Sequence, residues 1–269
     1  MQANQSRKRI VPLFKGKRKI SRPDDKEHVE LFEGRSDAPP ANAQLTYNGG
    51  ALIQNVEVYT LFWGNSWSAD AAMISTMNNI NQFFNDILVS PLLDQLSEYN
   101  VAGQYTIGYG KLVGTQVIVL GSPQPGSTID DTTIQSTIQN WVASGALPTP
   151  DANSLYFIYL DNQVKVTMGG GASCTDFCGY HDAINNNLYY AVMPYPSCYG
   201  CLGGLQPIDA LTGTSSHELC EAITDPAPPS GWYDNANNME IGDICAWTFK
   251  TVAGHNVQNE WSNAAKGCI

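Results

Sequence analysis

The stretch 215-SSHELCEAITDP-226 has the strongest bearing on the fold, because it places one histidine and two glutamates within five residues of a predicted helix. At about 100° per residue, His217 and Glu221 lie only about 40° apart on one helix face. Apolar residues, Leu219 and Ile223 among them, fall on the opposite side and would pack on a sheet. The stretch therefore predicts an amphipathic helix with one coherent polar face.

A simpler interpretation of the same residues needs no ligand. Ser215 and Glu218 have the spacing of a capping box, in which each side chain satisfies a backbone amide at the start of a helix. Asp225-Pro226 would then end the helix, because proline cannot continue the amide ladder. The sequence leaves both interpretations open.

The polar face also suits a divalent metal ion. An imidazole and a carboxylate one turn apart can bind the same ion, and Glu218 could then take a proton from metal-bound water. A third ligand would come from 240-EIGDIC-245, which supplies Glu240 and Asp243. These acids would repel one another unless a cation or protons neutralised them.

Two further residues are candidates for catalysis. We expect His181, in the loop predicted for 177-FCGYH-181, or Tyr233, in 231-GWYD-234, to stabilise an oxyanion. Zinc is the expected ion. Calcium and manganese are the alternatives, because the anionic Glu221 stands where a zinc protease has a neutral histidine.

The remaining periodicity predicts an α/β or α+β fold in which helices cover a mixed sheet, so that the helix of residues 215–226 would resemble the active helix of zincins. Apolar and β-branched runs predict strands, and apolar residues spaced by three and four predict helices. The expected strands are 55–64, 115–121, 154–162 and 187–196, and the expected helices are 69–88 and 131–144.

Charge divides the chain into a tail and a body. Residues 1–22 hold eight of the fourteen Lys and Arg, and we expect residues 1–40 to form a disordered tail or pro-segment. Residues 41–269, the expected single globular domain, hold four Lys against nineteen Asp and Glu. A body this acidic would repel phosphate backbones, so nucleic-acid binding is not expected.

The apolar runs of the sequence bear on membrane insertion and export. No run of about eighteen apolar residues exists, so no membrane span is expected. The basic start is followed only by IVPLF, which is shorter than the apolar region of a standard secretory signal. A standard signal peptide is therefore not visible.

The seven cysteines nevertheless favour an oxidising, extracellular location. The spacing suggests disulfides within CTDFC (Cys174–Cys178) and CYGC (Cys198–Cys201), and a third bridge from Cys245 to Cys268. Cys220 would be the odd cysteine, a small half-buried residue rather than a nucleophile.

A set of short motifs resembles the EXORDIUM, or phosphate-induced protein, family of plants and its bacterial and fungal relatives. The resemblance covers roughly residues 45–269 and rests on YNGG, VYTLFWGNSW, FCGYH, YPSCYGC, SHELCEAITDP, GWYD and EIGDIC. Plant members have alanine at the position of Cys220 and asparagine at that of Asp225. The resemblance implies a secreted, cell-wall or extracellular protein, and it implies no particular reaction.

Two functions follow as expectations. The first is a secreted zinc metallopeptidase or related hydrolase that acts on a peptide or protein, with Glu218 as general base. The second is a non-catalytic extracellular module that binds carbohydrate or cell-wall polysaccharide and keeps a structural ion. The six tryptophans and thirteen tyrosines would suit stacking on sugar rings in that case.

Overall fold

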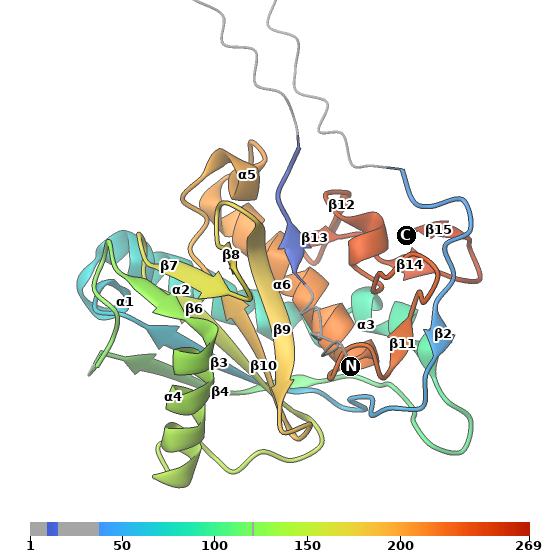
Figure 1. Cartoon of the computed structure of the whole chain (residues 1–269), viewed down its shortest axis with the longest axis horizontal. Coiled ribbons are helices and arrows are strands. Elements are labelled where there is room, and N and C mark those ends of the chain that lie inside the picture. The colour runs from blue at the N-terminus through green and yellow to red at the C-terminus, as the bar shows by residue number, and fades with distance from the viewer. Residues whose placement is uncertain (1–9, 16–37, 120) are drawn as a thin grey trace, which may run out of the picture.

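A computed structural model describes residues 10–15, 38–119 and 121–269 of the chain. Its centre is a mixed six-stranded sheet in the order β1-β9-β10-β6-β3-β4 (Figure 1). The four strands from β10 to β4 run parallel, whereas β9 and β1 are antiparallel to their neighbours. These strands are β1 (Val11–Pro12), β3 (Glu57–Trp63), β4 (Lys111–Ile118), β6 (Ser154–Leu160), β9 (Phe177–Ile184) and β10 (Leu188–Met193).

Helices cover both faces of this sheet. One face packs on α2 and α6, and the other on α4, so two apolar layers enclose the strands. The helices are α1 (Ser66–Ala69), α2 (Ala71–Ile87), α3 (Pro91–Gln95), α4 (Asp131–Ala143), α5 (Tyr199–Leu202) and α6 (Pro207–Thr224), with the 3-10 helices η1 (Leu96–Tyr99) and η2 (Asp243–Cys245).

Short strands complete the domain around the central sheet. β5, β7 and β8 form one small sheet, and β2–β11, β12–β13 and β14–β15 form three two-stranded pairs. Their bounds are β2 (Thr46–Tyr47), β5 (Thr128–Asp130), β7 (Lys165–Met168), β8 (Gly171–Ala172), β11 (Trp232–Tyr233), β12 (Phe249–Val252), β13 (His255–Gln258), β14 (Trp261–Ser262) and β15 (Gly267–Cys268). Among the described helices, none is both long and apolar enough to cross a membrane.

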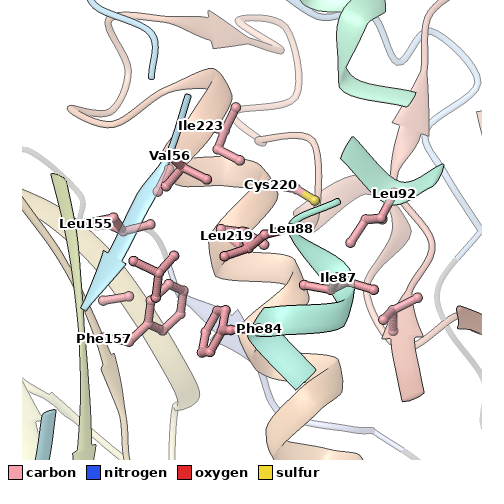
Figure 2. Packing of buried hydrophobic residues seen from close by; sticks show 14 of the residues in the cluster. Val56, Phe84, Ile87, Leu88, Leu92, Leu155, Phe157, Leu219, Cys220 and Ile223 are labelled. Atoms are coloured by element: carbon pink, nitrogen blue, oxygen red, sulfur yellow. The ribbon is translucent and has the colours of Figure 1, made fainter. Parts of the chain in front are cut away.

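The central helix α6 lies in the larger apolar layer. Its side chains Leu219 and Ile223 are at most 1% exposed and join the same apolar cluster as residues of α2 and of the sheet. Figure 2 shows this packing, in which the labelled side chains are Val56, Phe84, Ile87, Leu88, Leu92, Leu155, Phe157, Leu219, Cys220 and Ile223. Apolar burial on this side fixes which way the polar side of α6 points.

The predicted fold class and main elements are confirmed, with one clear shift. β4 begins at Lys111, four residues before the predicted strand, and its backbone pairs with β3 from Glu57 onward. The capping-box prediction is wrong. α6 begins at Pro207 after Gln206, so Ser215 lies inside the helix, where its hydroxyl is 2.8 Å from that of Tyr159. The helix does end at Thr224, before Asp225.

The disulfides differ from the predicted short-range pairs. Cys174 bonds to Cys198 and Cys178 bonds to Cys201, so both bridges join β9 and its preceding turn to the α5 region. The predicted third bridge, Cys245–Cys268, is present. Pairing within each motif would have closed two small loops, whereas the observed pairing links two elements. Cys220 is free and fully buried rather than half-buried.

Part of the expected tail belongs to the folded structure. Residues 10–15 are described, and Val11–Pro12 form β1 on the edge of β9. Residues 38–40 lead into the domain, and the remainder of the expected 1–40 tail lies outside the described residues.

The apolar side of α6 gives a stability prediction. Leu219→Ala removes a fully buried side chain and should lower the free energy of unfolding by about 2–5 kcal/mol. Val89→Ala is the control, because Val89 is 57% exposed and its truncation should change the free energy by less than about 0.5 kcal/mol. Urea unfolding of both variants measures the difference, and equal midpoints would contradict the packing described for α6.

Candidate metal centre

The polar residues of α6 meet a histidine from the sheet. His217, Glu218 and Glu221 lie on α6, and His181 lies on β9, which packs against α6. All four side chains are at most 1% exposed. Glu240, from the segment after β11, is also fully buried and joins the same neighbourhood. A helix, a strand and a loop therefore supply one enclosed cluster, which we name the histidine–glutamate cluster.

Glu221 occupies the middle of this cluster. Its Oε1 lies 2.9 Å from His217 Nε2, as the helix spacing predicts, and its Oε2 lies 3.5 Å from His181 Nδ1. The backbone amide of Asp243 donates to Glu221 Oε1 at 3.1 Å. The contact with His217 is short but not aligned as a hydrogen bond. Glu221 thus connects the two imidazoles.

The two nitrogens of His181 have different partners. Nε2 lies 3.1 Å from the backbone carbonyl of Asp225, which can only accept a hydrogen bond. With the proton on Nε2, the lone pair of Nδ1 faces Glu218 Oε2 at 2.9 Å and Glu221 Oε2 at 3.5 Å. A lone pair opposite two carboxylates needs a cation or an extra proton between them. A carbonyl partner that fixes the tautomer is a common support for metal-binding histidines.

Unsatisfied buried oxygens test whether a metal ion fits. Glu218 Oε1 and Glu221 Oε2 accept no hydrogen bond within the described part of the chain, although both are buried. Such atoms are costly to bury without a partner. Two sets of side chains place one ligand atom each within 4.8 Å of one another, namely His217, Glu218 and Glu221, and His181, Glu221 and Glu240. The residues therefore fit a metal ion, and Glu221 belongs to both sets.

Electrostatics within the cluster are strongly coupled. Burial lowers the pKa of His181, but the hydrogen bond to Glu218 and the charges of Glu218 and Glu221 outweigh it and raise the pKa to about 9. For His217, burial is likewise outweighed by Glu221, so the pKa rises well above its usual value. Burial raises the pKa of Glu218, and the neighbouring histidines more than offset burial at Glu221, whose pKa falls. Without a metal, the cluster is a set of proton-sharing ion pairs.

The predicted ligands are close together but grouped differently from the expectation. Glu240 lies nearer His181, with Oε1 3.6 Å from Nε2, and it joins the His181 set rather than the His217 set. Asp243 borders the cluster, where its Oδ2 accepts from the Glu240 amide at 3.1 Å. The Tyr233 hydroxyl donates to Asn238 Oδ1 at 2.8 Å.

His181 differs most from its expected setting. It lies in the middle of β9 rather than on a loop, so its position is fixed by strand pairing with Ala191 of β10. Its partner carbonyl belongs to Asp225, predicted only as a helix end, and lies against the cluster. Residues 177–181 are all buried, so FCGYHDAI lacks the alternation that could have indicated a strand.

The sequence motifs did not indicate one further buried acid, Glu260. Glu260 is fully buried, and burial raises its pKa well above the usual value, with His217 as the strongest opposing charge. The same carboxylate raises the pKa of the Cys220 thiol, after burial itself. A lone glutamate between two short strands carries no local signal of such a position.

Two glycines allow the backbone to approach the cluster. A Cβ atom on Gly242 would lie 2.8 Å from ring atoms of His217, and one on Gly179 would lie 3.4 Å from Glu218 Oε1. The loop before η2 therefore lies directly against His217, and glycine at position 242 leaves room for the ring. At Gly179 the tighter contact would be with Thr214, whose Cγ2 would lie 2.7 Å from the added Cβ, whereas Glu218 is at an ordinary van der Waals distance.

The aromatic residues mostly pack inside the protein. Trp63, Trp67 and Tyr233 are at most 3% exposed, and the ring of Trp232 packs tilted on Tyr47 and edge-on against Tyr99. Among the described aromatic side chains, Tyr109 is the one found with the exposed large apolar residues. The expected sugar-stacking surface is therefore not supported.

Comparisons with known proteins leave the family open. No family model matches the chain, and no curated protein matches it.

The close approach of Gly242 gives a prediction for the site. Gly242→Ala would force the His217 ring to shift and should lower the free energy of unfolding by about 1–3 kcal/mol. Gly267→Ala is the control, because the nearest atom to its added Cβ would lie 3.9 Å away. Thermal unfolding of the two variants tests this, and a Gly242→Ala protein as stable as its control would show that the ring is not confined.

Proposed function

We propose that the protein is a metal-dependent hydrolase, with a peptide or protein as substrate. The observation that carries the proposal is the convergence of His217, Glu218 and Glu221 with His181 in one buried cluster. Glu221 would hold the ion together with the imidazoles of His217 and His181. Glu240 would complete the ligands from the His181 side.

A divalent ion bound there would supply Lewis-acid activation of water and of a carbonyl group. Glu218 is the base, because its Oε1 has no hydrogen-bond partner within the described residues and can accept a proton. His181 Nδ1 lies 2.9 Å from the other oxygen of Glu218, and burial beside this imidazole confines that carboxylate. Because the base is already confined, it loses less orientational freedom when the reaction occurs.

The donor set favours zinc. Calcium takes oxygen ligands, whereas imidazole nitrogens suit zinc and other transition metals. Two imidazoles beside Glu221 outweigh the preference for harder ions that the carboxylate alone would give. Manganese remains the alternative ion with mixed nitrogen and oxygen ligands.

Location in an extracellular compartment is part of the proposal. Three disulfides support an oxidising compartment. The resemblance of the motifs above to the EXORDIUM family supports the same location. The buried aromatic residues do not favour the carbohydrate-binding alternative. That alternative would be a protein that binds the metal as a structural ion and cleaves no substrate.

Metal content tests the proposed ligands. The purified protein should carry about one zinc per chain, and Glu221→Gln should weaken zinc binding by at least about tenfold, as losses of metal-site groups do. Glu57→Gln is the control, because Glu57 pairs with Lys111 on β3 and β4, in a different part of the sheet. Mass spectrometry of metals in dialysed samples is the measurement. Full zinc content in the Glu221→Gln protein would overturn the ligand assignment.

Hydrolysis tests the proposed base. Glu218→Gln keeps the shape of the side chain but removes its basicity, and should lower casein cleavage by about 10²–10⁴-fold while zinc stays bound. Glu57→Gln should cleave casein at the wild-type rate. Zinc binding without any cleavage by the wild-type protein would leave a structural ion and reject the hydrolase.

A further inference from the structure

The N-terminal strand β1 lies on the outer edge of β9, about 165 residues away in sequence. β1 pairs antiparallel with β9, so that Val11 is opposite Gly179 and Pro12 is opposite Phe177. Figure 1 shows β1, the dark blue arrow, beside β9. Addition of a short strand to a sheet edge is a recognised mode of peptide binding.

Side chains of this segment pack against a surface formed by β9, α5 and Trp247, which we name the groove. Val11 is 3% exposed and packs on two disulfide-bonded cysteines. Phe14 is 8% exposed, and its ring meets Tyr199 and Trp247 edge-on, with centroids 5.9 and 5.2 Å apart. Two apolar side chains three residues apart are therefore the anchors.

Backbone contacts hold the same segment. The amide of Phe14 donates to the Gly200 carbonyl at 2.7 Å, and the indole of Trp247 donates to the Pro12 carbonyl at 2.8 Å. A Cβ on Gly200 would lie 3.1 Å from the end of the Leu13 side chain, so this backbone approaches the segment closely. The two bridges tie β9 and its preceding turn to the α5 region. Backbone contacts of this kind accept many sequences, and the contacts of Val11 and Phe14 restrict them.

The groove runs beside the histidine–glutamate cluster. Gly179, opposite Val11, is the residue whose added Cβ would approach Glu218 Oε1. His181 lies two residues farther along the same strand. A peptide paired with β9 would therefore pass along the side of the cluster that carries the base.

The ends of the docked segment carry basic residues. Arg7, Lys8 and Arg9 precede it, Lys15 is its last residue, and Lys17, Arg18 and Lys19 follow it, whereas the body is acidic. Opposite charge favours docking of this segment on the body. While the chain is intact, the segment binds intramolecularly at a high effective concentration, which a cut after the segment would abolish.

We propose that the groove of β9, α5 and Trp247 binds extended peptides with apolar side chains three residues apart, and that residues 10–15 occupy it in cis. A protease specific for basic residues would add water across one peptide bond within residues 15–22, leaving a carboxylate and an amine, and the freed segment would dissociate. Cleavage of a bound peptide at the histidine–glutamate cluster would rest on the proposed function. Binding of the peptide in the groove does not.

A binding experiment tests the groove directly. The full chain is cut with trypsin, the cut within residues 15–22 is verified by mass, and the product is separated by gel filtration. Fluorescence polarisation then follows a labelled peptide with the sequence of residues 7–19, in EDTA. The cut protein should bind it at least about tenfold more tightly than the intact protein. The same peptide with Phe14→Ala should bind at least about tenfold more weakly than the unchanged peptide.

Variants of the intact chain give a second test. Phe14→Ala in the full chain should admit the labelled peptide without a cut, whereas Val89→Ala, at an exposed site, should not. Equal binding by intact and cut protein, absence of binding after release, or retention of the cut segment through gel filtration would each overturn the proposal. The assay involves neither metal nor turnover. Failure of zinc binding or casein cleavage would therefore reject the proposed function and leave the groove standing.

Discussion

The contact between His181 of β9 and Glu218 of α6 is the constraint on which the polar interior depends. Several ionisable groups are removed from water around it, and each charge must be offset by another charge, a proton or an ion. The apolar side of α6, anchored by Leu219 and Ile223, supplies the favourable burial that keeps this arrangement in place. The apolar packing thus holds the carboxylates close together despite their mutual repulsion.

Glu221 shows how closely structure and chemistry are linked here. One of its oxygens faces His217 and an amide, and the other faces His181, so neither can turn away without losing a partner. Gly242 lets the backbone approach the ring of His217. A buried set of charged groups held in place in this way reduces the reorganisation needed to stabilise developing charge.

Local periodicity was enough to predict the main strands, the helix of residues 131–144 and the pairing of His217 with Glu221. Tertiary contacts decided the rest. The cysteine partners depend on how α5 approaches β9, and four nearby cysteines can pair in three ways. Ser215 satisfies the local rule for a helix start, but Pro207 begins the helix two turns earlier. The role of Glu260 depends on neighbours that are distant in sequence.

The position of β1 has a consequence for biosynthesis. Its residues are made before those of β9, whereas the groove that receives them is built from residues 177–203 and Trp247. Contacts between segments so far apart in sequence close a long loop, which slows their formation. β1 therefore has no edge to pair with until β9 has been made.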